Sequence, residues 1–290
     1  MISTDVRNNA GIREFLEYYL LVLLGEGPAP KGEIIETIEQ RSADNQKYRP
    51  GGVLRIAGSD LDEAIKRSIE RNLVKTGAQG GRFTLTRAGR KTLDKMNSQK
   101  EQVKSAKEDA IARLTSILVS DAGDKASEKY ALDVGTGEGS LAFRLAGVGF
   151  RVLGIDSSEF DYSKDSIKKA TESGRGKPDV DFQTMDVKDL EMEGAFDYVV
   201  SNQAVHCMQD QRGCISAVFR LMKKGGMLVV SDFRIGLKGF FAHGFHSFLA
   251  LSEEAWKDML PACGYADVRI HRVRDFYVVE ARKPGGRDLA

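Results

Sequence analysis

Residues 130–156 have the sequence YALDVGTGEGSLAFRLAGVGFRVLGID, in which two short apolar runs flank a glycine-rich turn. The first run, Tyr130 to Val134, is too short for a helix and predicts a buried strand. Because glycine has no Cβ atom, the turn lets backbone approach a ligand closely. The apolar residues that follow recur at helical spacing: Leu141, Leu145 and Val148. The second run ends at Asp156, and this order predicts a nucleotide-type site at the carboxyl edge of a parallel sheet.

The charges around the turn indicate which kind of nucleotide it suits. A dinucleotide site needs G-x-G-x-x-G, with pyrophosphate on the amino terminus of the helix. Here Ser140 stands where the third glycine is expected, and Asp133 and Glu138 bracket the turn. Two carboxylates would repel a pyrophosphate at short range. A ligand with a cationic end and an adenosine, such as S-adenosylmethionine, fits these charges better.

The segment DVGTGEGS, followed by GID, resembles motif I and the next acidic residue of class I S-adenosylmethionine-dependent methyltransferases. The resemblance covers roughly residues 125–283 and implies an α/β fold with a Rossmann-like sheet of seven strands. The pattern of residues agrees, since helical and strand segments alternate after Asp156. A strand is predicted at residues 227–231, and residues 266–272 and 276–281 would close the sheet as an antiparallel pair.

The resemblance also implies roles for the side chains at the strand ends. Asp133 would hold the methionine ammonium, Asp156 the ribose hydroxyls, and Asp186 the adenine amino group between Met185 and Val187. Caps of local turns are the alternative roles for Asp156 and Asp186. The full set expected to bind S-adenosylmethionine is Asp133, Gly135, Thr136, Gly137, Gly139, Asp156, Ser157, Met185, Asp186, Val187 and Ser201.

Residues 201–208, SNQAVHCM, follow the fourth strand of this sheet, where methyltransferases differ by acceptor. The proline pair typical of enzymes that methylate the amino groups of bases is absent from this segment. The segment is instead similar to the small-molecule and quinone-type branch, in which a histidine often stands at the position of His206. His206 is therefore a candidate catalytic residue, and a packed core histidine is the alternative.

Residues 234–251, RIGLKGFFAHGFHSFLAL, form an aromatic insertion that we expect to lie over the donor methyl group. Its four phenylalanines, Phe240, Phe241, Phe245 and Phe248, would make an apolar wall. His243 and His246 are further catalytic candidates, because neutral imidazole is available as a base near pH 7. A core-packing helix with exposed histidines is the alternative. No CxxC or HExxH motif supports a metal site.

The amino-terminal part, residues 1–98, predicts helices, a glycine-tipped hairpin and a closing helix, with a long polar loop from Arg41 to Gly58. The piece RFTLTRAGRKTL resembles the end of many winged-helix domains. Such a domain pairs subunits in small-molecule O-methyltransferases, so we expect it to mediate dimerisation or cover the substrate. Asp60, Asp62 and Glu63 at the start of the third helix would face phosphate unfavourably, which disfavours nucleic acid. A linker helix over residues 99–124 would lead to the methyltransferase domain, residues 125–290.

Composition sets few further limits. The net charge is +1, and the three cysteines fit neither a disulfide framework nor a zinc motif. The early apolar run is too short to span a membrane, so a cytoplasmic protein without a membrane segment is expected. The sequence predicts methyl transfer from S-adenosylmethionine to a small-molecule acceptor. A cofactor-sensing transcription regulator without turnover, and an RNA or protein methyltransferase, are the alternatives.

Overall fold

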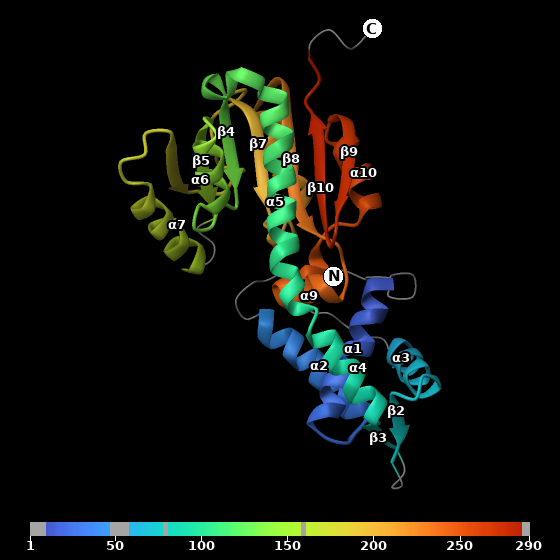
Figure 1. Cartoon of the computed structure of the whole chain (residues 1–290). Helices are drawn as coiled ribbons and strands as arrows, with labels where there is room; N and C mark the ends of the chain where they lie inside the picture. The colour runs from blue at the N-terminus through green and yellow to red at the C-terminus, as the bar shows by residue number, and fades with distance from the viewer. Residues whose placement is uncertain (1–9, 47–57, 78–80, 158–160, 286–290) are drawn as a thin grey trace. The chain divides into compact units, whose positions relative to one another are not determined.

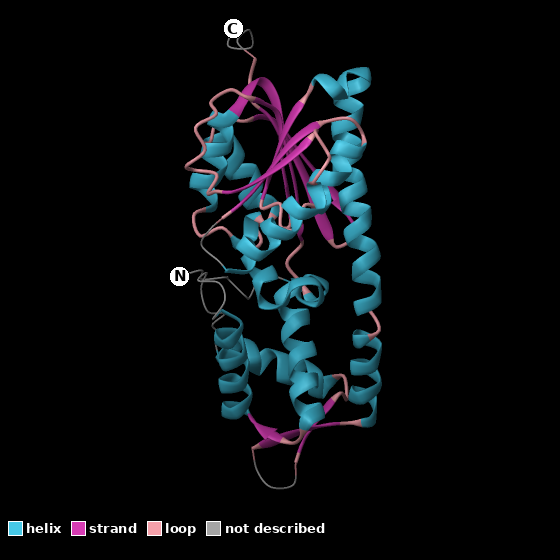
Figure 2. Cartoon of the chain, turned by 90° about the vertical axis from the view of Figure 1, so that its left-hand side faces the viewer, coloured by secondary structure: helices cyan, strands magenta, loops and turns pink. Residues whose placement is uncertain are grey.

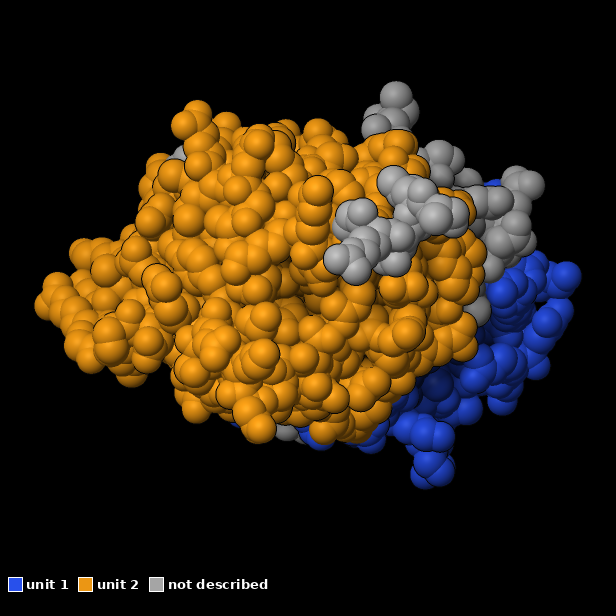
Figure 3. Space-filling view, turned by 90° about the horizontal axis from the view of Figure 1, so that it is seen from above, with its two compact units in different colours: residues 1–105, 235–249 blue, residues 106–234, 250–290 orange. Residues whose placement is uncertain are grey.

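The computed structural model describes residues 10–46, 58–77, 81–157 and 161–285, which form two compact units (Figures 1 and 3). The N-terminal unit contains the described residues up to Ser105 together with residues 235–249. The sheet unit contains residues 106–234 and the described residues from Ala250 onward. Among the described residues, no helix combines the length and apolar character that a membrane span requires.

The N-terminal unit is mainly helical and is built around α1. Its elements are α1 (Ala10–Glu26), β1 (Ala29–Pro30), α2 (Lys31–Gln46), α3 (Gly58–Glu70), β2 (Val74–Thr76), β3 (Arg82–Leu85), α4 (Arg87–Asn97), α9 (Leu237–His243) and η4 (Gly244–Leu249). The helix α1 supplies the largest share of the buried core, including Phe15, Leu16 and Leu20. Strand β3 lies between β1 and β2 and is antiparallel to both. The hydroxyl of Thr86 accepts a hydrogen bond from Gly89 N at 3.0 Å and caps α4.

One boundary in this unit differs from the prediction. Helix α2 continues through Gln46, so the loop expected from Arg41 is wrong at its start. The guanidinium of Arg41 lies 2.9 Å from a carboxylate oxygen of Glu26, at the end of α1, and this ion pair supports the last turns of α2. The rest of the predicted loop, residues 47–57, lies outside the described residues.

The sheet unit contains a seven-stranded sheet with helices on both sides (Figure 2). After α5 (Lys100–Ala122), whose first residues belong to the N-terminal unit, its elements are η2 (Gly123–Glu128), β4 (Tyr130–Val134), α6 (Ser140–Gly147), β5 (Arg151–Asp156), α7 (Asp161–Gly174), β6 (Val180–Thr184), β7 (Phe196–Asn202), η3 (Val205–Cys207), α8 (Gln211–Leu221), β8 (Met222–Phe233), α10 (Glu253–Ala262), β9 (Ala266–Val273) and β10 (Phe276–Arg282).

The strand order of this sheet is β6-β5-β4-β7-β8-β10-β9, and all neighbours are parallel except those of β10. The predicted Rossmann-like α/β sheet and its closing antiparallel pair are thus confirmed. Because β4 lies between β5 and β7 and is parallel to both, its carboxyl end meets the ends of both neighbours. This edge of the sheet is where the order of strands reverses, the usual place for a ligand in such folds.

Candidate functional site

The glycine turn after β4 packs tightly against its neighbours. Gly135 has a positive φ of +74°, and a Cβ atom added there would lie 2.2 Å from the Cβ of Ala204. The amides of Gly135 and Thr136 both donate to the carbonyl of Ile155, at 2.9 and 3.0 Å. At Gly137, by contrast, an added Cβ would meet no atom within 4 Å. The turn therefore leaves no room for a side chain at Gly135, whereas the space beside Gly137 is open.

Asp133 lies beneath this turn as a buried carboxylate. Its side chain is 1% exposed and accepts a hydrogen bond from the Thr136 hydroxyl at 2.7 Å. Burial raises the pKa of Asp133 to about 7, the bond from Thr136 opposes the rise, and the charge of Asp156 adds to it. A cation placed near Asp133 would favour its ionised form. The site therefore suits a positively charged group.

Asp156 ends β5 beside the open part of the turn. One carboxylate oxygen accepts from Gly137 N at 3.0 Å, and the other accepts from Ser157 N at 2.9 Å. Through these two bonds Asp156 caps the turn, which is the alternative role that the sequence left open for it. A carboxylate accepts hydrogen bonds through two oxygens, and Asp156 is the kind of group to which ribose hydroxyls donate. Ser157 contributes its backbone N–H group to this cap.

The segment after β6 lies next to Asp156, because Met185 N donates to the Asp156 carbonyl at 2.8 Å. The carboxylate of Asp186 accepts from Lys188 N at 2.8 Å, which caps a turn, and it is partly exposed. Met185 is half-buried, whereas Val187 is 4% exposed and belongs to the core of the sheet unit. Asp186 is thus available at this edge, while Val187 presents little surface.

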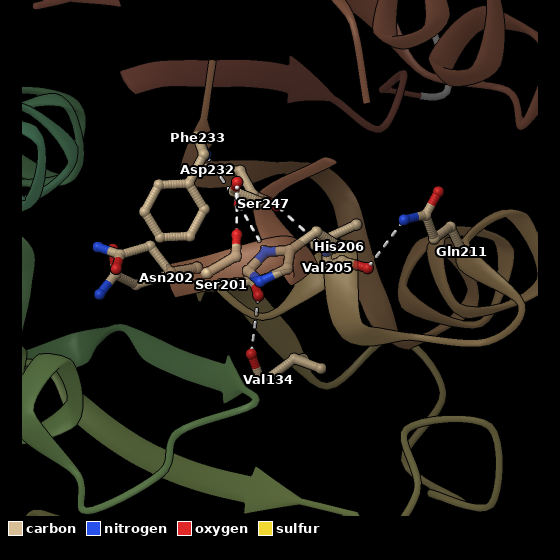
Figure 4. A network of polar contacts seen from close by, with 11 residues as sticks. Val134, Ser201, Asn202, Val205, His206, Gln211, Asp232, Phe233 and Ser247 are labelled. Carbon is tan, nitrogen blue, oxygen red and sulfur yellow. Dashed lines mark hydrogen bonds and ion pairs between the residues drawn. The ribbon is translucent and has the colours of Figure 1, made fainter. Parts of the chain in front are cut away.

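Ser201 has a structural partner. Its hydroxyl donates to the Val134 carbonyl at 2.8 Å, and the side chain is 3% exposed, so it ties β7 to β4 (Figure 4). Two residues after Ser201, Gln203 takes the left-handed conformation with φ of +56°. Its backbone N–H donates to the Ser231 carbonyl at 2.7 Å. Strained backbone of this kind concentrates at functional sites.

His206 forms a buried pair with Asp232, which the sequence did not single out. The Nδ1 atom of His206 lies 2.7 Å from one Asp232 oxygen, and its backbone N donates to the other at 3.2 Å (Figure 4). Both side chains are 0–1% exposed. Phe233 N also donates to Asp232 at 2.8 Å, and the Phe233 ring lies 5.2 Å from the imidazole, edge to face. The pair therefore joins the carboxyl ends of β7 and β8.

The pair is electrostatically coupled. Burial alone would lower the pKa of His206, but the charge of Asp232 and the bond to it outweigh burial and raise this pKa to about 10. An imidazolium–carboxylate pair is consequently the form at neutral pH. The signal that could have identified Asp232 is its place at the end of the strand that pairs in parallel with β7.

The two other candidate histidines lie in the insertion. His243 ends α9 and His246 lies in η4, and their side chains are outside the described part of the structure. The rings of Phe240 and Phe241 pack against α1, with centroids 4.9 Å from Phe15 and Tyr18, respectively. Both rings are partly buried against the core of the N-terminal unit, and the wall over the donor methyl stays a prediction. The described side chains contain no cluster of three or more histidines, cysteines or acids suited to a metal.

The glycine turn and the acids beside it fit S-adenosylmethionine, the donor that the charges in the sequence suggested. It offers a backbone cradle open at Gly137, a buried acid whose ionised form a cation would favour, and a second acid with acceptor capacity toward hydroxyls. These are the groups that the sulfonium, the ammonium and the ribose of S-adenosylmethionine require.

Comparison with known proteins also indicates a methyltransferase. Residues 125–260 match a family described as a methyltransferase domain. The ubiquinone biosynthesis O-methyltransferase of Thiobacillus denitrificans is 34% identical over 118 residues, 39% of this chain and 47% of that protein. An uncharacterized 37.1 kDa protein in transposon TN4556 of Streptomyces fradiae is 26% identical over 237 residues, 73% of this chain and 64% of that protein. The chain thus spans about half the length of the first relative.

A solved carbon methyltransferase, CurJ, has the same fold over 95% of this chain and 92% of its own, with a TM-score of 0.54 and 12% identity. Residues 125–260 are a methyltransferase domain of the S-adenosylmethionine-dependent class.

Proposed function

We propose that this chain transfers a methyl group from S-adenosylmethionine to a hydroxyl oxygen of a small aromatic acceptor. The observation that supports oxygen is the buried His206–Asp232 pair, because methylation of a hydroxyl requires a base for its proton. The relatives named ubiquinone biosynthesis O-methyltransferase support the same reaction class.

The cofactor would be held by the residues at the ends of β4, β5 and β6. In this proposal Asp133 faces the cationic end, Asp156 accepts from the ribose hydroxyls, and Asp186 meets the adenine with Met185 and Val187 beside it. The glycine turn supplies the close backbone. When bound, the cofactor supplies an electrophilic methyl group on its sulfonium.

The chain's own chemistry is then to move one proton. The acceptor hydroxyl would give its proton to Nε2 of His206, since Nδ1 faces Asp232, and its oxygen would take the methyl group. Asp232 acts as a positioning residue, since it fixes the ring through Nδ1 and balances the imidazolium charge. The raised pKa makes the neutral imidazole of His206 a stronger base than a free histidine, which suits the weakly acidic proton of a hydroxyl group. An aromatic hydroxyl is the acceptor that we propose, in line with the relatives named ubiquinone biosynthesis O-methyltransferase.

A test follows from this protonation state. With methyl-labelled S-adenosylmethionine and a panel of phenols and catechols, the rate should rise about tenfold per pH unit from pH 6.5 toward 9, because only neutral imidazole is a base. The measurement is initial rate against pH at saturating cofactor.

The contribution of the pair to the free energy of unfolding has the opposite trend: it is complete below the ordinary histidine pKa and is lost as pH rises through about 10. Cofactor binding without methylation of any acceptor would instead favour the regulator.

Asp133 provides a second test, of the cofactor end. Because the pKa of this acid is raised to about 7 and a cation needs it ionised, S-adenosylmethionine should bind more tightly as pH rises from 6 to 8. Calorimetry at pH 6.5 in buffers of different ionisation enthalpy should show proton release on binding. Asp133→Asn should abolish the release. Release that persists in this variant would place the proton elsewhere.

The domain organisation is part of the proposal. Residues 1–98 would be a winged-helix domain that pairs two copies or covers the acceptor, residues 99–124 a linker helix, and residues 125–290 the catalytic domain. On α3, Asp62 pairs with Lys31 at 2.5 Å and Glu63 with Arg67 at 2.8 Å. Carboxylates interleaved with the basic side chains of this helix would repel phosphate, which supports a small molecule over a nucleic acid.

A further inference from the structure

Three residues on neighbouring strands of the sheet unit lie in one row. Asp133 of β4 pairs with Gly154 of β5, and Gly154 pairs with Phe182 of β6. Residues in register on parallel strands direct their side chains to the same face of the sheet. Because glycine has no side chain, the middle of this row leaves space between the buried carboxyl group of Asp133 and the ring of Phe182.

The space at Gly154 is filled from two sides. A Cβ atom added there would lie 2.6 Å from the Phe182 ring and 2.8 Å from the hydroxyl oxygen of Thr136. That hydroxyl donates its hydrogen bond to Asp133 at 2.7 Å. The missing side chain therefore lets the ring lie against the backbone of β5 and lets the Thr136 hydroxyl stay on the carboxyl group of Asp133.

The ring of Phe182 also contacts the glycine turn. A Cβ atom added at Gly139, where φ is +83°, would lie 2.7 Å from this ring and 3.0 Å from the ring of Phe143, which meets Phe182 edge to face at 5.3 Å. Gly139 N in turn donates to the Thr136 carbonyl at 2.9 Å. Since Phe182 is 8% exposed, its ring is closely packed and restricts movement of the turn.

We propose that Phe182 and Gly154 are positioning residues for S-adenosylmethionine: the ring, seated against Gly154, supports the glycine turn and keeps the Thr136 hydroxyl on Asp133. Neither residue needs to contact the cofactor. Phe182 acts on the backbone of the turn, and Gly154 acts through the space that it leaves. This inference rests on the cofactor site of the proposed function, in which Asp133 faces the cationic end of the donor.

The role of the ring is tested with two leucine variants of the full chain. Phe182→Leu removes ring atoms that lie against Gly139 and Gly154. Phe219→Leu is the matched control, because the ring of Phe219 lies 3.0 Å from a Cβ atom added at Gly264, before β9 begins and outside the proposed cofactor site. Calorimetry at pH 7 should find S-adenosylmethionine bound about tenfold or more weakly by Phe182→Leu. Phe219→Leu should also lower the thermal midpoint but keep the affinity within about twofold of wild type.

A second readout needs no cofactor. The new methyl group in Gly154→Ala would displace the Thr136 hydroxyl, whose bond opposes the rise in the pKa of Asp133. Carbon-13 NMR of the carboxyl groups, with Asp133 assigned by Asp133→Asn, should place the Asp133 midpoint about one pH unit above wild type in Gly154→Ala. Thr136→Val removes the same bond and should give the same shift. The charge of Asp156, which also raises this pKa, is present in each of these proteins.

Two results would overturn the inference. One is an affinity for S-adenosylmethionine in Phe182→Leu within about twofold of wild type, as expected for the control. The other is an Asp133 midpoint that does not move in Gly154→Ala. If Asp133→Asn binds S-adenosylmethionine as wild type does at every pH, the proposed cofactor site is wrong, while the NMR midpoint still decides whether Gly154 keeps the Thr136 bond in place.

Discussion

Replacing His206 with glutamine is expected to lower the rate of methyl transfer about 10²–10⁴-fold, the usual contribution of a positioned general base. Glutamine retains polarity at this buried position but cannot take a proton from the acceptor. The residues that we propose for the cofactor lie at the ends of β4, β5 and β6, so calorimetry should find the affinity for S-adenosylmethionine within about twofold of wild type. A loss of affinity equal to the loss of rate would mean that His206 serves binding rather than proton transfer.

Asp232→Asn tests the charge of the residue that pairs with His206, because it removes the charge and nearly keeps the shape of the side chain. The amide keeps the size of the side chain but removes the charge that raises the His206 pKa. The rate should therefore fall less than in His206→Gln, and its rise with pH should level off at a lower pH. Asp210→Ala is the matched control, because that carboxylate only caps α8 through Gly213 N, at 2.8 Å. It should cost about 1 kcal/mol of stability and leave the rate unchanged.

The resemblance together with the alternation of apolar runs predicted the sheet, because each strand of a parallel sheet is a short buried run between turn residues. It was weaker at boundaries. Val148 fits the helical spacing after the glycine turn, yet it is 43% exposed, because α6 ends at Gly147 and the chain then turns at Gly149 with φ of +102°. Spacing alone does not mark the residue at which a helix stops.

The residues of the proposed acceptor side were harder to predict, because they meet through distant pairing. Asp232 lies 26 positions after His206, and only the register of β7 with β8 brings the two together. Phe240 and Phe241 are apolar in sequence, but nothing local indicates that their neighbours are Tyr18 and Phe15, more than two hundred residues earlier. The residues proposed for the cofactor follow their strands directly and could be named from a motif.

Two glycines of the same turn should lose different amounts of stability when replaced by alanine. Both Gly135 and Gly137 have positive φ, so each substitution incurs about 1–2 kcal/mol for the left-handed conformation. Only Gly135→Ala adds a clash, since its Cβ would lie 2.2 Å from the Cβ of Ala204. Overpacking adds about 1–3 kcal/mol. Urea unfolding should therefore show a loss of roughly 2–5 kcal/mol for Gly135→Ala and about half that for Gly137→Ala.

Ala204→Gly should rescue the first variant and not the second. Without the Cβ of Ala204, the nearest remaining atom to the new Cβ at position 135 is the Ala204 Cα, at 3.7 Å, an ordinary contact. The double variant should then recover about 1–3 kcal/mol of stability. Gly137→Ala places its methyl group in the open space that we assign to the cofactor, so it should weaken S-adenosylmethionine binding about tenfold or more despite its smaller effect on folding. If Gly137→Ala binds the cofactor as wild type does, the cradle lies elsewhere on this edge of the sheet.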